Sequence, residues 1–308
     1  MIGTILLLLF TVVVVPVISF FYGTPLSTLQ GDLLQEMMLI VLGVILYSFI
    51  VGQLSGNNSQ TDKLWSLVPI YYTWHMTYFA GMPEKMVLMS VLVTIWGARL
   101  TYNFGRRGGY SWKFWAGEED YRWEVLRKKP GFSNPWVWRV FDLFFICGYQ
   151  HTLIFLFTLP ILAVAGTPGA DVITSADYLL GSLMVACVVL EFIADQQQYN
   201  FQTEKYRRKN AGEELGEYAH GFVRTGLWKY MRHPNYAMEQ SVWLIFYFFS
   251  VSATGEWLNW SITGALLLVI LFKSSSDFSE AVTAEKYPEY AIYQRTTPRF
   301  VPFSKRYK

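Results

Sequence analysis

LLQEMMLIVLGVILYSFIVGQL, residues 33–54, decides the fold, because Glu36 is the one charged side chain in its 22 residues. A helix of this length reaches about 33 Å, which is enough to cross roughly 30 Å of hydrocarbon. The whole chain of 308 residues is 53% hydrophobic. Comparable apolar runs are found at residues 1–22, 64–80, 86–104, 140–166, 177–194, 237–254 and 257–276. The sequence therefore predicts an all-α, polytopic transmembrane helical bundle of about seven to eight helices.

The first run, residues 1–22, has neither the basic amino-terminal region nor the small-residue cleavage site of a signal peptide. We therefore expect it to be kept as a helix. Cys147 and Cys187 each lie in the middle of a predicted span, so they indicate neither a disulfide framework nor a metal site.

Basic residues gather on one side of the predicted membrane. With these spans, all but two of the 25 Lys and Arg residues fall on that side, the exceptions being Lys85 and Arg99. Because cytoplasmic loops carry an excess of Lys and Arg, the basic loops and both termini are predicted to face the cytosol. The segment 105–139 is expected to form a short amphipathic helix at the interface, and residues 195–236 and the carboxyl end make up the other basic segments.

Charged residues inside the predicted spans mark a candidate site, since a charge in the bilayer is costly and is retained mostly for function. Arg99, Glu191 and Asp195 are such residues. Helical spacing lines up two polar stripes, one formed by Trp96, Arg99, Asn103 and Arg106, the other by Glu191, Asp195, Gln198 and Gln202. Together they predict a charged cavity open to the cytosol. The alternative is that Arg99 pairs with Glu191 or Asp195 only to lock the bundle.

The segment RTGLWKYMRHPNYAMEQSVW, residues 224–243, gives the sharpest local signal. Pro234 suits the first turn of a helix, whose free amides attract anions. Arg232 and His233 immediately precede it, which predicts a phosphate-binding corner in which Arg232 contributes more than the tail residue Lys305. Asn235, Tyr236, Glu239 and Trp243 would face the ligand. The alternative is that the Arg–His pair contacts lipid headgroups.

This segment resembles the carboxyl-terminal signature of the steroid 5-alpha-reductase superfamily, and more closely its DUF1295 subgroup. The matching positions are Leu227, Trp228, Tyr230, Arg232, His233, Pro234, Asn235, Tyr236 and Glu239. The same subgroup is similar at TDKLWSLVP (61–69), WGARLTYNFGRRGGY (96–110), EEDYRW (118–123), ADQQQYNFQ (194–202) and YQRTTPRFVP (293–302). The resemblance covers roughly residues 60–303. It implies a domain at 59–308 with a cytosolic cofactor site, preceded by amino-terminal transmembrane helices at 1–58.

The resemblance further implies an NADPH-dependent oxidoreductase that reduces an activated C=C bond of a lipid or steroid-like substrate. The cofactor contacts that it implies, together with the corner, are Arg99, Asn103, Arg106, Arg107, Glu191, Asp195, Arg232, His233, Asn235, Tyr236, Glu239 and Trp243. In such a site basic residues would hold phosphates, and carboxylates would hold ribose or amide groups. The expected partners are the small-molecule substrate and membrane lipids, with no nucleic acid.

The catalytic acid is less defined, because the chain departs from the family at two positions. Trp96 stands where steroid reductases carry a substrate-polarising tyrosine, and their catalytic glutamate has no clear match near Gln53 or Asp62. The candidates for the acid and its orienting group are Asp62, Tyr72, His75, Tyr149 and Gln150.

Two other functions remain open. An S-adenosylmethionine-dependent methyltransferase of the isoprenylcysteine carboxyl type would share the Arg-His-Pro corner, although the RRGGY and EDYRW segments argue against it. A non-catalytic sterol-binding protein would fit Trp96. The closing KRYK is similar to a retrieval signal, which favours the endoplasmic reticulum membrane, with a bacterial inner membrane as the alternative.

Overall fold

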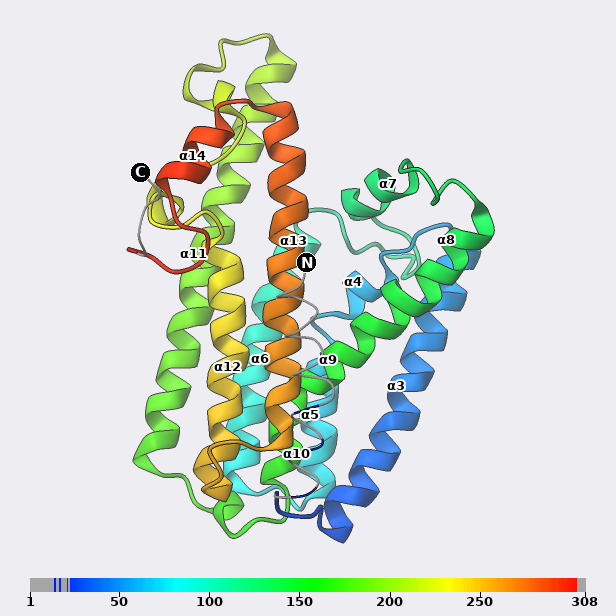
Figure 1. The fold of residues 1–308 in the computed structure, drawn as a ribbon, viewed down its shortest axis with the longest axis vertical. Coiled ribbons are helices and arrows are strands. Elements are labelled where there is room, and N and C mark those ends of the chain that lie inside the picture. The colour runs from blue at the N-terminus through cyan, green and yellow to red at the C-terminus, as the bar shows by residue number, and fades with distance from the viewer. Residues whose placement is uncertain (1–13, 15–16, 18–20, 22, 304–308) are drawn as a thin grey trace. The chain divides into compact units, whose positions relative to one another are not determined.

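The computed structural model describes residues 14, 17, 21 and 23–303, and every regular element in this part of the chain is helical. Figure 1 shows the long helices running alongside one another within each part of the chain. The α-helices are α3 (Thr28–Ser55), α4 (Gln60–Leu64), α5 (Val68–Phe79), α6 (Glu84–Gly105), α7 (Tyr121–Arg127), α8 (Pro135–Phe141), α9 (Gln150–Thr158), α10 (Pro160–Val164), α11 (Ser175–Ala211), α12 (Pro234–Thr254), α13 (Thr263–Lys286) and α14 (Tyr290–Thr296). A π-helix, η2 (Asp142–Tyr149), joins α8 to α9.

The chain forms two compact units. Unit 1 extends to Ser182 and also includes Ile245–Leu267, whereas unit 2 consists of Leu183–Leu244 and the residues from Leu268 onward. Helices α11, α12 and α13 therefore each contribute to both units.

Five helical segments among the described residues are long and apolar enough to cross a membrane: Thr28–Ser55, Glu84–Gly105, Pro135–Val164, Ser175–Ala211 and Trp260–Lys286. They confirm the prediction of an all-α membrane-type fold and match five of the predicted runs. Helix α12, with 21 residues, covers the predicted run 237–254 but is not among the five.

Two predicted spans do not become long helices in the described structure. The run 64–80 contains α5, whose 12 residues reach only about 18 Å and so cannot cross the hydrocarbon core. Its length is limited by Gly81, which has a positive φ of 88° and follows the helix directly. The predicted run 1–22 falls almost entirely outside the described residues.

Helix α11 is longer than the sequence pattern indicated. The predicted span stopped at residue 194, but the helix continues to Ala211 and has 37 residues. At about 1.5 Å per residue it is about 55 Å long, well beyond the thickness of the hydrocarbon core. The part from Asp195 to Ala211, expected to be a basic loop, is therefore a helix.

Local sequence explains where the long helices begin and how closely they pack. Helix α3 starts with a capping box, in which the Ser27 side chain accepts from the Gln30 backbone and the Gln30 side chain accepts from the Ser27 backbone. In unit 1, α5 lies close to α6 because Gly97 has no side chain. A Cβ there would be 2.6 Å from Cδ1 of Ile70, a residue of α5, and 2.7 Å from the carbonyl oxygen of Ser66. The close packing of α5 and α6 therefore depends on glycine at this position.

Candidate functional site

In unit 1 the TDKLW and EEDYRW motifs lie against each other. The Trp123 indole donates to Asp62 Oδ2 over 2.9 Å, and the Asp120 backbone amide donates to Ser59 Oγ over 2.9 Å. The Asn58 amide donates to Glu119 Oε1 over 2.7 Å. Two segments about 60 positions apart in the sequence are thus bonded together. We call residues 57–63 with 114–127 the motif clasp.

Two carboxylates of the motif clasp have opposite pKa shifts. Burial raises the pKa of Asp62, and the charge of Asp120 adds to this effect, although Arg122 and hydrogen bonds from Ser59 and Trp123 oppose it. Burial also acts to raise the pKa of Asp120, but here Arg122 outweighs it and holds the pKa below its ordinary value. Arg122 forms a bidentate ion pair with Asp120, in which Nε lies 2.8 Å from Oδ1 and Nη2 lies 3.0 Å from Oδ2. Its Nη2 also lies 3.6 Å from Oδ1 of Asp62. Asp62, predicted to orient the catalytic acid, is thus part of this clasp.

Among the other predicted catalytic residues, Tyr72 has the most unusual surroundings. Its side chain is fully buried, and the ring packs edge-on against Phe155 of α9. Its hydroxyl has no hydrogen-bond partner among the residues that the structure describes. A buried polar group without a partner is uncommon and calls for an explanation, of which a catalytic role is one.

The remaining catalytic candidates are placed differently. His75 Nε2 lies 3.2 Å from Glu36 Oε1, and its ring packs between Tyr71 and Phe79. Tyr149 is half-buried at the end of η2, and Gln150 is buried at the start of α9. Among the described residues, Tyr72 contacts α9, the helix on which Gln150 lies, whereas His75 contacts Glu36.

Unit 1 contains a buried acid that was not among the residues predicted from the sequence. Asp142 is 1% exposed at the start of η2 and accepts from the Gln53 amide over 2.7 Å. The Cys147 thiol lies 3.7 Å from the same carboxylate. Because Asp142 falls inside the predicted run 140–166, the rule that charges within spans mark functional positions applied to it as well. A π-helix at this place is also a common feature of functional sites.

A second buried acid in unit 1 belongs to an ion pair. Lys85 Nζ lies 3.0 Å from Asp177 Oδ2, both side chains are fully buried, and the ammonium also donates to Ser252 over 3.2 Å. Asp177 closes the start of α11 by accepting from the backbone and hydroxyl of Thr174. This pair ties α6 to α11 within unit 1 and explains how Lys85, which the sequence placed opposite the basic loops, can be buried.

The predicted basic stripe lies at the end of α6 in unit 1. Arg99 and Asn103 are 8% and 7% exposed, whereas Arg107 is exposed. Arg106 donates to Asn103 Oδ1 from Nε and Nη2, over 3.0 and 2.7 Å. Trp96 is fully buried and packs edge-on against Phe157. The helical spacing predicted from sequence is therefore present in α6.

The predicted acidic stripe lies in unit 2. The Asn235 amide of α12 donates to Asp195 Oδ1 of α11 over 3.1 Å, and one turn further the Trp243 indole donates to Glu239 Oε1 over 3.0 Å. Asp195, Glu239 and Glu191 are each at most 4% exposed. Asp195 lies about 30 Å along the axis of α11 from Ser175. The Asp195–Asn235 pair is therefore about one hydrocarbon thickness from the start of this helix. We call Glu191, Asp195, Asn235, Glu239 and Trp243 the acidic stripe.

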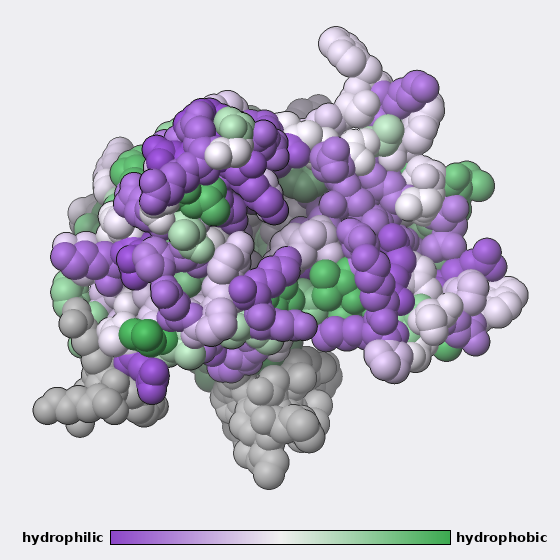
Figure 2. All heavy atoms as spheres, turned by 90° about the horizontal axis from the view of Figure 1, so that it is seen from above, coloured by the Kyte–Doolittle hydropathy of each residue, from purple (hydrophilic) through white to green (hydrophobic). Residues whose placement is uncertain are grey.

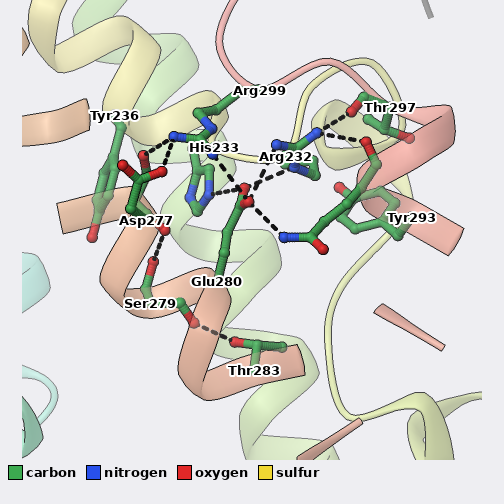
Figure 3. A network of polar contacts seen from close by, with 12 residues as sticks. Arg232, His233, Tyr236, Asp277, Ser279, Glu280, Thr283, Tyr293, Thr297 and Arg299 are labelled. Atoms are coloured by element: carbon green, nitrogen blue, oxygen red, sulfur yellow. Dashed lines mark hydrogen bonds and ion pairs between the residues drawn. The ribbon is translucent and has the colours of Figure 1, made fainter. Parts of the chain in front are cut away.

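The predicted phosphate corner has internal partners. Figure 3 shows Arg232 and His233 directed at Glu280 of α13, with Arg232 Nε at 2.7 Å and His233 Nε2 at 2.8 Å from the same Oε1. Arg232 Nη2 lies 3.2 Å from Oε2, and Nη1 donates to the backbone carbonyls of Gln294 and Thr297. These contacts use most of the donors of the guanidinium. They give Arg232 a role in holding unit 2 together; its predicted contact with a cofactor stays a prediction.

The carboxyl-terminal segment completes this network. The backbone amides of Arg232 and His233 donate to the carbonyls of Pro298 and Arg299, over 2.9 and 3.1 Å. Arg299 also reaches Glu280, at 3.4 Å, and pairs with Asp277. His233 stacks on Tyr236 with the ring planes 14° apart. The TTPRF segment is therefore bonded across the start of α12, a feature that the sequence did not reveal.

Comparison with known proteins identifies one family over most of the chain. The family model described as "Protein of unknown function (DUF1295)" matches residues 48–297, from within α3 to the residue after α14. Uncharacterized protein C594.04c of Schizosaccharomyces pombe is 34% identical over 283 residues, which cover 85% of this chain and 79% of that protein. No solved structure matches the chain. The chain therefore belongs to the DUF1295 family.

Proposed function

We propose that this protein is an NADPH-dependent reductase that saturates an activated C=C bond of a lipid or steroid-like substrate. The observation that carries the proposal is the Tyr72 hydroxyl, fully buried and without a partner among the described residues. An enone needs a donor at its carbonyl oxygen while hydride is added, and a phenol in apolar surroundings is suited to that task.

In the proposed reaction Tyr72 donates a hydrogen bond to the substrate carbonyl oxygen. NADPH, when bound, would supply a hydride to the β-carbon of the enone. The Tyr72 hydroxyl would stabilise the negative charge that develops on the oxygen, and a proton from solvent would add to the α-carbon to give the saturated ketone. The apolar neighbours of Tyr72, among them Phe155, exclude water and so strengthen this interaction.

The acidic stripe supports the cofactor assignment. Carboxylate and amide oxygens accept hydrogen bonds from ribose hydroxyls and from a carboxamide, and Asp195 and Asn235 supply both kinds of group in one bonded pair. Trp243 adds a flat apolar surface one turn along α12 from Glu239. The candidates for phosphate contacts are the basic residues Arg99, Arg106 and Arg107 at the end of α6 and Arg232 ahead of α12. The Arg232 guanidinium already contacts Glu280 and two backbone carbonyls.

The methyltransferase is the second candidate, and a sterol-binding protein without activity is the third. Methyl transfer to a carboxylate does not require a buried phenolic donor, because it needs no acid at the acceptor oxygen. Binding of a sterol without a reaction does not require one either. We also propose that the protein resides in the endoplasmic reticulum membrane with its basic loops in the cytosol, as the charge asymmetry favours.

The test uses calorimetry on the full-length protein in detergent with four ligands, NADPH, NADH, S-adenosylmethionine and a sterol. We expect NADPH to bind with micromolar or tighter affinity, NADH more weakly, and S-adenosylmethionine not at all. Binding of S-adenosylmethionine without NADPH would replace the reductase by the methyltransferase. Binding of a sterol with neither cofactor would favour the inactive protein.

A further inference from the structure

Unit 2 has a pocket that the proposed function does not use. It encloses about 190 Å³ and lies between the loop before α12 and helix α14. Its floor is aromatic, because Phe222 and Tyr293 stack with centroids 5.3 Å apart and ring planes 27° apart. Arg224 and Lys229 stand at its walls. None of these residues belongs to the acidic stripe or to the basic stripe of α6.

The pocket carries positive charge that has few internal partners. Lys229 is exposed and has no ion pair or hydrogen bond among the described residues. Arg224 Nη2 lies 2.6 Å from His220 Nε2, and since Arg always donates, that ring nitrogen accepts. The His220 proton is then on Nδ1, which faces Glu289. Two cations, Arg224 and Lys229, and one acid, Glu289, line the pocket, so its net charge is positive and favours the binding of an anion.

Large apolar side chains surround the charges instead of being buried. Ile292, which lines the pocket, is 56% exposed, and Tyr230, next to Lys229, is 47% exposed. The Tyr230 ring meets that of Phe303, which is 85% exposed, at a centroid distance of 6.0 Å. Figure 2, seen from above relative to Figure 1, shows many hydrophilic residues with hydrophobic ones among them. Cations beside exposed aromatic and aliphatic groups are typical of a surface that contacts lipid headgroups and acyl chains.

We propose that this pocket binds the phosphate of an anionic membrane phospholipid. Arg224 and Lys229 hold the phosphate, because each cation near an anionic headgroup adds to binding. Ile292, Tyr230 and Phe303 contact the upper part of the acyl chains. The bound lipid would fix the loop 222–231, and with it the start of α12, at the membrane surface.

The experiment measures lipid binding to the full-length protein in neutral detergent by native mass spectrometry. The probes are phosphatidylserine, phosphatidylcholine and inorganic phosphate. We expect phosphatidylserine to bind more tightly than phosphatidylcholine. The double variant Arg224→Gln, Lys229→Gln should weaken phosphatidylserine binding roughly 10- to 30-fold. The matched control Lys209→Gln, which removes an exposed charge of the same unit outside the pocket, should change it by less than about twofold.

Further variants separate the lipid from other anions. Ile292→Ser and Phe303→Ser should weaken phosphatidylserine binding and leave inorganic phosphate unaffected. The charge-conserving Lys229→Arg should retain binding, which gives a result even where the double variant does not fold. Equal binding of phosphatidylserine and phosphatidylcholine, or an equal loss in Lys209→Gln, would overturn the proposal. A parallel loss of NADPH affinity in the double variant would instead assign the pocket to the cofactor, and the reductase proposal would stand.

Discussion

The guanidinium of Arg232 forms a bidentate ion pair with the carboxylate of Glu280, with Nε 2.7 Å from Oε1 and Nη2 3.2 Å from Oε2. Both side chains are at most 9% exposed. The pair joins the start of α12 to α13, and the remaining bonds of Arg232 reach the carboxyl-terminal segment. Arg232, which the sequence predicts to bind an anion, thus connects three parts of unit 2. We call the Arg232–Glu280 pair the brace.

Breaking this brace should destabilise the protein. Glu280→Gln leaves Arg232 as a buried charge without its partner, so we expect a loss of about 3–5 kcal/mol, measured as a clear fall in melting temperature in detergent. Lys273→Ala is the matched control, because it removes a partner from the exposed Lys273–Asp277 pair of the same helix. That control should cost less than about 1 kcal/mol.

The same variants separate the brace from a direct phosphate contact. A direct contact predicts that Arg232→Ala weakens NADPH binding while Glu280→Gln does not. The brace predicts that both variants lower the melting temperature together. Arg232→Lys should not restore stability, because an ammonium cannot make the side-on contact. An unchanged melting temperature in Glu280→Gln would refute the brace.

Tyr72→Phe tests the proposed acid. Removing the hydroxyl should lower kcat for enone reduction roughly 100- to 10,000-fold, the usual contribution of a general acid. Stability should be unchanged or slightly higher, since a buried hydroxyl without a partner is lost. Tyr78→Phe, at an exposed position of the same helix, is the control and should leave kcat within about threefold of the native value. Equal activity of the native protein and Tyr72→Phe would remove Tyr72 from the mechanism.

Asp195 and Asn235 should support cofactor affinity as a pair. Asp195→Ala or Asn235→Ala is expected to weaken NADPH binding about tenfold, because each removes one hydrogen-bonding group worth roughly 1.5 kcal/mol. The double variant should be little worse than either single one, since the two side chains are bonded to each other. Asn200→Ala, at an exposed position of the same helix, should have no effect on the calorimetric affinity.

The motif clasp should give opposite pH responses at its two acids. The raised pKa of Asp62 means that its contribution to stability is present below its unfolded pKa and is lost as pH rises through the folded pKa. Asp62→Asn should therefore stabilise the protein at about pH 7, and the gain should shrink toward about pH 4.

Asp120 has a lowered pKa, so its stabilisation is present above the unfolded pKa and is lost as pH falls through the folded pKa. Asp120→Asn should thus destabilise the protein at neutral pH and have little effect in strong acid. Melting temperatures across the pH range decide both cases. If the two variants changed stability in the same direction at neutral pH, the assignment of charges in the clasp would be wrong.

The predicted orientation can be tested at the two ends of α11. Cysteines introduced at Asp171 and Lys209 lie beyond opposite ends of an apolar stretch long enough to cross the membrane. In sealed vesicles with the cytosolic face outward, we expect a membrane-impermeant maleimide to label Lys209→Cys and to leave Asp171→Cys unlabelled. Labelling of both positions from one side would show that α11 does not span the membrane.

Much of the fold follows from the sequence because a bilayer imposes a simple length rule. Runs such as 33–54 and 86–104 are apolar for about 20 residues, and both lie in helices. The ends of the helices are harder to predict, because a helix can continue into water with charged residues at no cost in free energy. This is why the extension of α11 beyond residue 194 was missed.

The sequence by itself determined the membrane-type helical fold, the uneven distribution of basic residues and the stripes on α6 and α11, since these depend on composition and on spacing along one helix. Tertiary structure decided which polar groups have partners. Arg232 and Glu280 are 48 positions apart, and no local pattern indicates their pairing. Tyr72 and His75 lie one turn apart on an apolar helix, yet His75 meets Glu36 while the Tyr72 hydroxyl meets no described partner. The physical reason is that a buried polar group is satisfied by whatever other segments bring to it, and only packing between helices fixes those neighbours.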